Sequence, residues 1–188
     1  LGFSDIQAEL AAELIQAGEQ VAIFNQRTIQ DILDVVYTVG RLVEAGDRAA
    51  ELVDGYIERL AQMRERSENN DYRRPRVYFE EWPDPRITCI RWVSQLIEIA
   101  GGKPVFPELA KQKGAEGRTI EPGDVIDKEP DIIMASWCGK PVDIESIRSR
   151  DNYNDLPAVR DDEIHEIDPA IILQPGPACL TDGLARVS

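Results

Sequence analysis

Histidine and cysteine are both scarce, with one histidine and three cysteines in 188 residues. Cys89, Cys138 and Cys179 are odd in number and far apart, a spacing that indicates neither a disulfide framework nor a zinc site. We interpret Cys89 and Cys179 as small, half-buried residues. His165 falls within a predicted strand, which favours an ordinary strand position over a ligand role. The chain also lacks a glycine-rich phosphate loop, a Gly-x-Ser-x-Gly elbow and clustered His or Cys, so no recognised catalytic motif is present.

Positive charge and long apolar runs are also in short supply. Against 21 Lys and Arg stand 35 Asp and Glu, a formal net charge of −14. Nucleic acid and anionic membrane surfaces are therefore poor partners, and a cationic partner is favoured. No apolar run approaches the roughly 18 residues that span a bilayer, so we expect no direct membrane insertion. The chain begins at Leu1-Gly2-Phe3, with no signal peptide in this sequence.

What is present is an alternation of helix and strand patterns. Apolar spacing from Asp5 predicts a helix that ends at Gly18, and residues 21–24 form a short buried strand. We interpret residues 1–4 as the tail of a preceding strand, so that the segment is the second half of a βαβ unit. Such a sheet needs more strands than the chain supplies, and we expect an amino-terminal part of the fold to precede this sequence.

A long connector follows this first unit. Thr28 and Asp31 form a predicted capping box at the start of a second helix. A third helix, from Asp47 to about Glu68, repeats apolar residues at spacings of three and four and extends about 30 Å. Residues 64–74 have the composition of a linker, and alternating strand and helix patterns from residue 76 onward predict a compact α/β unit.

The stretch from residue 76 to residue 92 is the strongest candidate for a site. Its β-forming residues stop at Glu80-Glu81, and Pro83 and Pro85 bar helix formation beyond them. We therefore expect Glu80 to Arg86 to be a rigid loop at the carboxyl end of a strand, where open α/β sheets bind ligands.

The side chains of this stretch suit a polar ligand with flat apolar faces: Glu81, Trp82, Arg91 and Trp92. The alternative is that the two indoles fill a core beneath the loop, and for Trp92 both interpretations stay open. Adjacent strand positions place Glu80 and Glu81 on opposite faces, which disfavours a paired-carboxylate mechanism, and one of them is a candidate ion-pair partner of Arg91.

Two further rigid loops are predicted at the same edge of the sheet, from Trp137 to Pro141 and from Gln174 to Pro177. Loops rich in Trp, Pro and Gly lower the entropic cost of ordering a binding surface. Cys138, at a strand end, is an alternative candidate for a thiol nucleophile with His165 as its base. The sequence does not indicate that these two residues meet.

The motifs in order resemble one family. They are Glu80-Glu81-Trp82-x-x-Pro85-x-x-x-x-x-Arg91-Trp92, Ala100-Gly101-Gly102, Glu129-Pro130-Asp131-Ile132-Ile133, Trp137-Cys138-Gly139 and Leu173-Gln174-Pro175-Gly176-Pro177-x-x-x-x-Asp182-Gly183-Leu184. This arrangement resembles the helical-backbone class of ABC-transporter substrate-binding proteins, in particular its cobalamin-binding branch beside the ferric-siderophore binders.

The resemblance implies an α/β fold of two Rossmann-like lobes joined by a long backbone helix. Residues 1–46 would be the remnant of the amino-terminal lobe, residues 47–75 the backbone helix and linker, and residues 76–188 the complete carboxyl-terminal lobe. If the rest of the first lobe were absent from the molecule, the exposed half-cleft would be prone to self-association with another copy.

The function implied is capture of a corrinoid (cobalamin) between the lobes and its delivery to an ABC permease, with no cofactor of its own and no catalysis. The alternatives are a ferric siderophore or haem as ligand, or, in another class, a small thiol enzyme using Cys138. A periplasmic or cell-surface location is implied. The ligand-binding residues expected are Glu81, Trp82, Arg91, Trp92, Trp137, Cys138, Gly139, Gln174, Pro175 and Gly176.

The resemblance also implies an acidic residue that docks the transporter. In the family this acid lies in the short helix that begins near Glu121. The corresponding position here is Gly123, so Glu121 or Asp124 is expected to take its place.

Overall fold

The computed structural model describes residues 2–3, 7–69 and 73–188. The chain divides into two compact units, Leu1–Asp54 and Gly55–Ser188. The boundaries predicted at residues 46 and 75 separate the lobes implied by the family resemblance, not spatially compact units. They stay a prediction.

The first unit begins with a small parallel sheet. Strands β1 (Gly2–Phe3) and β2 (Ile23–Phe24) pair in parallel, with α1 (Ala8–Gln16) between them. This is the predicted βαβ half, although the expected strand over 21–24 is reduced to its last two residues and is not buried, since Ile23 is exposed. The predicted helix start at Asp5 lies outside the described residues. Gly18 has φ +89°, the left-handed conformation that suits a glycine after a helix.

Helices α2 (Ile29–Leu42) and α3 (Gly46–Glu68) follow in sequence. The predicted capping box is present, since the Thr28 hydroxyl accepts the Asp31 N–H at 3.1 Å and the Asp31 carboxylate accepts the Thr28 N–H at 2.9 Å. Gly40 lies against Ala49, where an added Cβ would be 2.2 Å from that of the alanine. A side chain at position 40 would therefore push the two helices apart.

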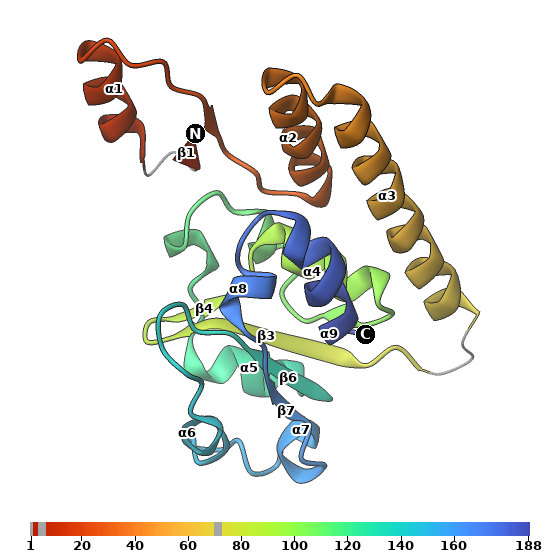
Figure 1. Cartoon of the computed structure of the whole chain (residues 1–188). Coiled ribbons are helices and arrows are strands. Elements are labelled where there is room, and N and C mark those ends of the chain that lie inside the picture. Colours follow the sequence, from red (N-terminus) through yellow and green to blue (C-terminus); the bar gives the residue numbers. More distant parts are fainter. Residues whose placement is uncertain (1, 4–6, 70–72) are drawn as a thin grey trace. The chain divides into compact units, whose positions relative to one another are not determined.

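The second unit is a three-layer α/β structure (Figure 1). Its sheet has the order β4-β3-β6-β7, with β5 pairing with the start of β3. The strands are β3 (Arg76–Pro83), β4 (Arg86–Thr88), β5 (Lys103–Pro104), β6 (Ile132–Ala135) and β7 (Ile164–Glu166). The helices and short turns are α4 (Arg91–Ile99), η2 (Leu109–Lys111), η3 (Glu116–Arg118), α5 (Pro122–Lys128), α6 (Ile144–Arg148), α7 (Pro157–Arg160), α8 (Pro169–Ile172), η4 (Cys179–Gly183) and α9 (Leu184–Arg186).

Parallel pairing of β3, β6 and β7 places the carboxyl ends of these strands at one edge, as predicted. One face of the sheet packs on α5, α6 and α7 through Tyr78, Ile133 and Ala135. Helix α4, most of whose residues are buried, lies on the other side of the sheet in Figure 1. Both faces are covered, which explains the continuous apolar run of β6.

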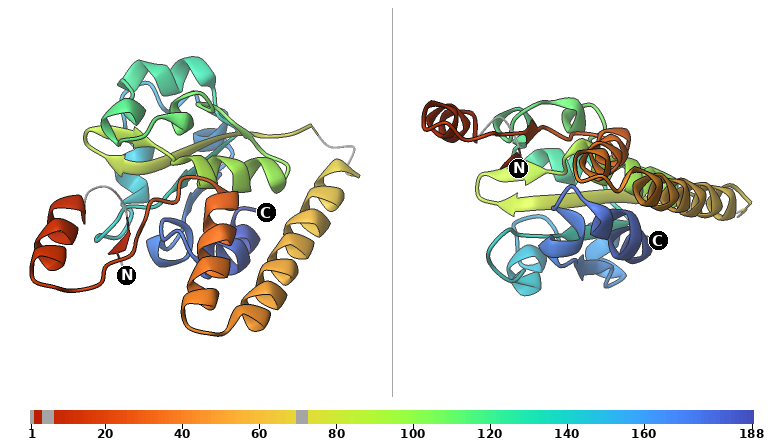
Figure 2. Two further views of the ribbon diagram at one scale, coloured as in Figure 1. Left: turned by 90° about the horizontal axis from the view of Figure 1, so that it is seen from above. Right: turned by 45° about the horizontal axis from the view of Figure 1, so that its top comes forward.

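The stretch after β3 corrects one expectation. The strand does not stop at Glu80-Glu81 but continues to Pro83, and β4 pairs with it antiparallel, with Pro83 opposite Arg86. The predicted loop Glu80 to Arg86 is therefore the upper part of a β-hairpin, with its turn at the cis peptide Asp84–Pro85. Both views of Figure 2 show this yellow-green hairpin. The prolines take terminal strand and turn positions, where no ladder hydrogen bond is lost.

The chain after β7 also differs from expectation. The predicted rigid crossing over residues 171–177 starts within a short helix, α8, so that only residues 173–176 form a turn. The last predicted helix, from Ala178, already starts at Pro177, and it passes through a π-helical turn, η4, before α9.

Candidate functional site

Two of the three predicted loops meet at the carboxyl end of the sheet. The Lys140 Nζ lies 4.4 Å from the centre of the Trp82 ring and 5.0 Å from that of Trp137. One ammonium thus joins the β3–β4 hairpin to the loop that follows β6. We call Trp82, Trp137 and Lys140 the indole–lysine cluster.

A buried carboxylate fixes the inner indole of this cluster. Glu80 is completely buried, and its Oε1 accepts a hydrogen bond from the Trp137 indole N–H at 3.2 Å. The same carboxylate accepts the Tyr78 hydroxyl at 2.9 Å and two bonds from Arg150, at 2.5 and 2.9 Å. Trp137 therefore has a set orientation, because its only polar atom is bound to a group that cannot move toward solvent.

The charges of this network are compensated. Burial alone would lower the pKa of Arg150, but its hydrogen bonds to Glu80 and the attraction of the nearby negative charges together outweigh burial and raise that pKa above its ordinary value. Burial and the nearby Glu80 charge raise the pKa of the Tyr78 hydroxyl, which stays neutral and donates. Glu80 thus holds Tyr78, Trp137 and Arg150 together through its two oxygens.

Glu81 points to the other face, as its alternation with Glu80 predicted. It forms a bidentate ion pair with Arg118, at 2.5 and 2.9 Å, and its Oε2 also accepts the Ile90 N–H at 3.2 Å. Arg118 is 3% exposed and also donates to the Thr88 carbonyl. The expected pairing of one of the two acids with Arg91 is wrong, since each acid has another arginine as its partner.

The two tryptophans of the first stretch lie in different surroundings. Trp82 is partly exposed, and its indole N–H donates to the Asp84 carbonyl at 2.9 Å within the hairpin. Trp92 is 2% exposed, and its N–H donates to the Ile172 carbonyl at 2.9 Å. Trp82 is therefore available to a ligand, whereas Trp92 is a core residue that ties α4 to α8.

The remaining predicted residues are dispersed. Arg91, Cys138, Gly139 and Gln174 are exposed, and Pro175 and Gly176 are half-buried. In the turn, the Gly176 N–H donates to the Gln174 carbonyl at 2.9 Å and the Cys179 thiol to the Gly176 carbonyl at 3.1 Å. Across residues 73–188 the structure joins this third turn to neither of the other two loops by a hydrogen bond, ion pair or ring contact.

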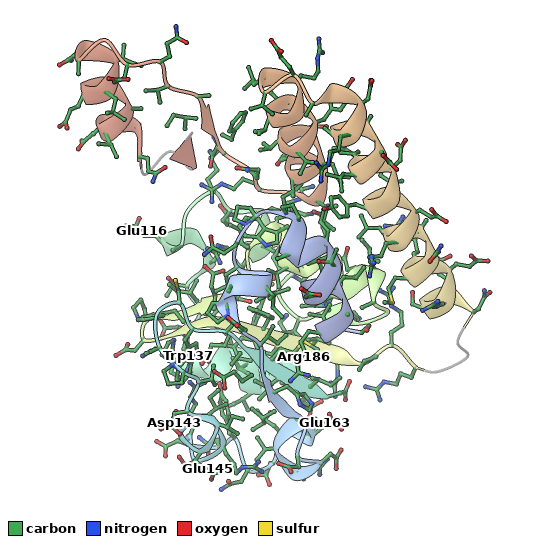
Figure 3. All side chains as sticks on the ribbon, viewed as in Figure 1. Glu116, Trp137, Asp143, Glu145, Glu163 and Arg186 are labelled. Carbon is green, nitrogen blue, oxygen red and sulfur yellow. The ribbon has the colours of Figure 1, made fainter. Side chains whose placement is uncertain are left out.

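The thiol and histidine of the alternative mechanism are not in contact. Cys138 is an exposed free cysteine. The Nε2 atom of His165 lies instead 2.7 Å from the Glu163 carboxylate. Glu163 precedes β7, whereas Trp137 and Cys138 follow β6, and Figure 3 shows Glu163 and Trp137 at opposite ends of the sheet.

Glu121 and Asp124, the expected docking acids, are both exposed at the start of α5. They form a reciprocal capping box, in which the Asp124 carboxylate accepts the Glu121 N–H at 2.8 Å. Their outer surfaces face solvent, and docking stays a prediction.

Sequence reasoning missed three of the groups that build the site: Arg150, Arg118 and Lys140. Arg150 lies 70 positions from Glu80, and no local pattern links the two. Arg118 is the last residue of a basic loop that contains glycine, and nothing in the sequence of this loop indicates that its side chain is buried. Lys140 directly follows Trp137-Cys138-Gly139, and its position in a predicted site loop was the available signal.

A hollow of about 400 Å³ lies elsewhere in this unit, and none of the predicted ligand residues line it. It is bordered by Glu163, His165 and Arg186. Figure 3 labels Glu163 and Arg186, and both lie away from Trp137. Over the described part of the chain, no group of three or more His, Cys, Asp or Glu is placed to hold a metal ion. None of the described helices combines the length and apolarity that crossing a membrane requires.

Residues 1–171 match the family model described as periplasmic binding protein. The chain belongs to this family. Its α/β fold is that of solved substrate-binding proteins of the ABC-transporter class, in agreement with the sequence motifs. Among curated proteins, none matches the sequence significantly.

Solved structures of this class share the fold. A possible iron-binding (periplasmic solute-binding) protein from Staphylococcus epidermidis superposes with a TM-score of 0.78 at 21% identity, over 96% of this chain and 69% of that one. IsdE of S. aureus, complexed with haem, gives 0.78 at 15% identity, over 100% and 74%. The vitamin B12 binding protein BtuF of Vibrio cholerae gives 0.67 at 21% identity, over 96% and 68%.

Proposed function

We propose that this periplasmic binding protein captures a corrinoid (cobalamin) outside the cytoplasm and delivers it to the permease of an ABC importer. The observation that carries the proposal is the partly exposed Trp82 at the carboxyl end of the sheet, which the exposed Lys140 joins to Trp137, itself buried at 4% exposure. A corrin offers a broad flat face with amide arms. An indole and the polar groups around it complement such a surface through apolar contact and hydrogen bonds.

The rigidity of the wall supports binding rather than chemistry. Trp137 is held by Glu80, Trp82 by the Asp84 carbonyl, and Glu81 by Arg118. Preformed walls reduce the entropy lost on binding, which increases affinity for a ligand that fits. The solved relatives include proteins that bind vitamin B12 and haem, which agrees with a flat macrocycle as ligand.

A ferric siderophore or haem is the second candidate ligand. The observation in its favour is the Lys140 ammonium in the site, which suits a ligand with negative charge. We keep the corrinoid first because its amide periphery also matches the exposed Gln174. The thiol-enzyme alternative has no comparable support, because Cys138 and His165 are not in contact.

Titration with cyanocobalamin, followed by calorimetry and by quenching of tryptophan fluorescence, tests the proposal. We expect saturable binding that is weakened at least fivefold by Trp82→Ala and unaffected by Arg160→Ala, a surface change on α7. Binding of haemin or a ferric hydroxamate without binding of cyanocobalamin would establish the second candidate. A reaction abolished by Cys138→Ala, with ligand binding retained, would instead establish the thiol enzyme.

A further inference from the structure

Lys140 has an unusual position for a surface lysine. Its ammonium lies over two indole rings at once, 4.4 Å from the centre of Trp82 and 5.0 Å from that of Trp137. Both distances fall within the range in which a cation is attracted by the ring face. Each indole is itself held by a hydrogen bond, Trp137 to Glu80 and Trp82 to the Asp84 carbonyl. The two indole rings that attract the ammonium therefore have fixed orientations of their own.

The backbone favours this position of the lysine. Gly139 has φ +82°, a left-handed conformation that a side chain disfavours, and the Lys140 N–H donates to the Trp137 carbonyl at 3.4 Å. The chain therefore turns back immediately after Trp137, which brings the side chain of residue 140 over the rings.

The ammonium has no carboxylate partner in the part of the chain that the structure describes. No Asp or Glu there lies within 4.0 Å of the Lys140 Nζ. The acids near it in sequence or in the site are engaged otherwise: Asp143 accepts the Ser146 N–H, Glu166 the Val142 N–H, and Glu80 is paired with Arg150. The other four lysines also lack an ion pair among the described residues, so what distinguishes Lys140 is the position of its ammonium over two indole rings at the site.

We infer that Lys140 is the residue that recognises negative charge on the ligand: an anionic oxygen carried by a large flat macrocycle. The ring faces hold the ammonium from one side, since they attract cations and repel anions. Its N–H donors on the open side are then left for a charge-assisted hydrogen bond to carboxylate or phosphate oxygen. The inference rests on the proposed function, because it assigns a role to Lys140 within that site.

Two ligand chemistries supply such an oxygen. A porphyrin carries carboxylates at its edge, and a cobalamin carries a phosphate diester in the nucleotide tail below the corrin. Each source has a neutral counterpart at this position: the dimethyl ester of iron protoporphyrin IX, and cobinamide, which lacks the phosphate and the nucleotide. The two pairs of probes separate recognition of the charge from recognition of the ring.

The experiment measures the Kd of all four probes for the native chain and for Lys140→Met, which keeps the length of the side chain and removes its charge. We expect Lys140→Met to weaken either iron protoporphyrin IX or cyanocobalamin about tenfold, the size of one exposed charge-assisted hydrogen bond. The corresponding neutral probe should change less than about twofold. Lys140→Arg should restore binding of the anionic probe at least in part.

Lys128→Met is the matched control, because its ammonium also lies over an aromatic ring, 5.8 Å from the centre of Phe106. It makes the same change in net charge on α5, so it should leave the preference for the anionic probe unchanged. Thermal unfolding of each variant checks that the fold is retained.

The outcomes distinguish this inference from the proposed function. If a macrocycle binds but Lys140→Met weakens the binding of charged and neutral probes equally, Lys140 does not recognise the negative charge of the ligand. The proposed binding function is then retained. If none of the four probes binds the native chain, the proposed macrocycle binding fails and the inference fails with it.

Discussion

Glu80 and Arg150 form a buried, bidentate ion pair between residues 70 positions apart. The Arg150 guanidinium lies 2.5 Å from Oε2 and 2.9 Å from Oε1 of a carboxylate that is completely buried. Tyr78 and Trp137 donate to the same two oxygens. The pair therefore connects the centre of the sheet with the loop after α6 and supports the inner indole of the site from below.

We expect Glu80→Gln to lower the free energy of unfolding by about 3 kcal/mol, because it leaves the largely buried Arg150 without a counter-charge. Urea denaturation measures the change. Arg150→Met should have a comparable effect, and the double variant should be more stable than the sum of the two changes by at least about 1 kcal/mol. Additive effects would contradict a direct pair.

The matched control is Asp162→Asn. Asp162 also pairs with an arginine, Arg148, but on the surface, with 79% of its own side chain exposed. Water screens such a pair, so the same neutralisation should change stability far less than at Glu80.

The two tryptophans of the first stretch should separate stability from binding. Trp92→Phe removes the indole N–H that donates to the buried Ile172 carbonyl, so we expect a loss of about 2 kcal/mol of stability. Ligand affinity should stay within about twofold of native, because the buried side chain of Trp92 offers no surface to a ligand. Trp82→Phe should do the opposite, with weaker binding and little change in stability. An affinity loss confined to Trp92→Phe would return Trp92 to the site.

The sequence pattern predicted the helices and strands well, but it predicted poorly which distant residues contact one another. The period of apolar residues, the Thr28–Asp31 capping box and the continuous run of β6 all depend on neighbours along the chain, and all are present. The β3–β4 hairpin was missed because Pro83 and Pro85 also suit a loop, and only the pairing of Arg86 with Pro83 decides between the two.

The site divides in the same way. Trp82 and Trp137 were predicted from their places at strand ends, and they meet through Lys140. The burial of Trp92 and the ion pairs of Glu80 and Glu81 depend on residues that are 80, 70 and 37 positions away. Nothing near them in sequence carries that information.

Native thiol labelling should detect one of the three cysteines. Burial raises the pKa of the Cys89 thiol to about 12 and that of Cys179 to about 11, so neither is deprotonated at pH 8. Cys138 is exposed. With an aromatic disulfide reagent at pH 8 we expect one rapid equivalent, which Cys138→Ser removes, and three equivalents in denaturant. Rapid labelling of the folded Cys138→Ser variant would show that a buried thiol is accessible.

Asp131 should make stability depend on acid pH. Its partial burial raises the pKa of its carboxyl, but hydrogen bonds from the Arg76 side chain and N–H outweigh burial and leave the pKa below 3.8. A group with a lowered folded-state pKa stabilises the fold above its unfolded value and loses that contribution as pH falls through the folded one. We therefore expect Asp131→Asn to lower stability by about 1 kcal/mol at pH 7 and by much less near pH 2.

The comparison requires unfolding curves at several pH values between 7 and 2. Asp155→Asn is the control, an exposed carboxylate that joins no ion pair among the residues the structure describes. If the difference in free energy of unfolding between native and Asp131→Asn stays constant down to pH 2, the carboxylate stabilises the fold independently of its charge.

Gly183 should tolerate no side chain. A Cβ at this position would lie 2.3 Å from the Ile171 carbonyl oxygen and 3.2 Å from the Ile172 side chain, both in the packed region around α8. Because a backbone atom cannot rotate away, Gly183→Ala should force η4 from α8 and lower stability by about 2 kcal/mol. Gly123→Ala, in α5 with no atom within 4 Å of the added Cβ, should leave stability unchanged or raise it slightly. Equal thermal midpoints for the two variants would show that η4 can move aside.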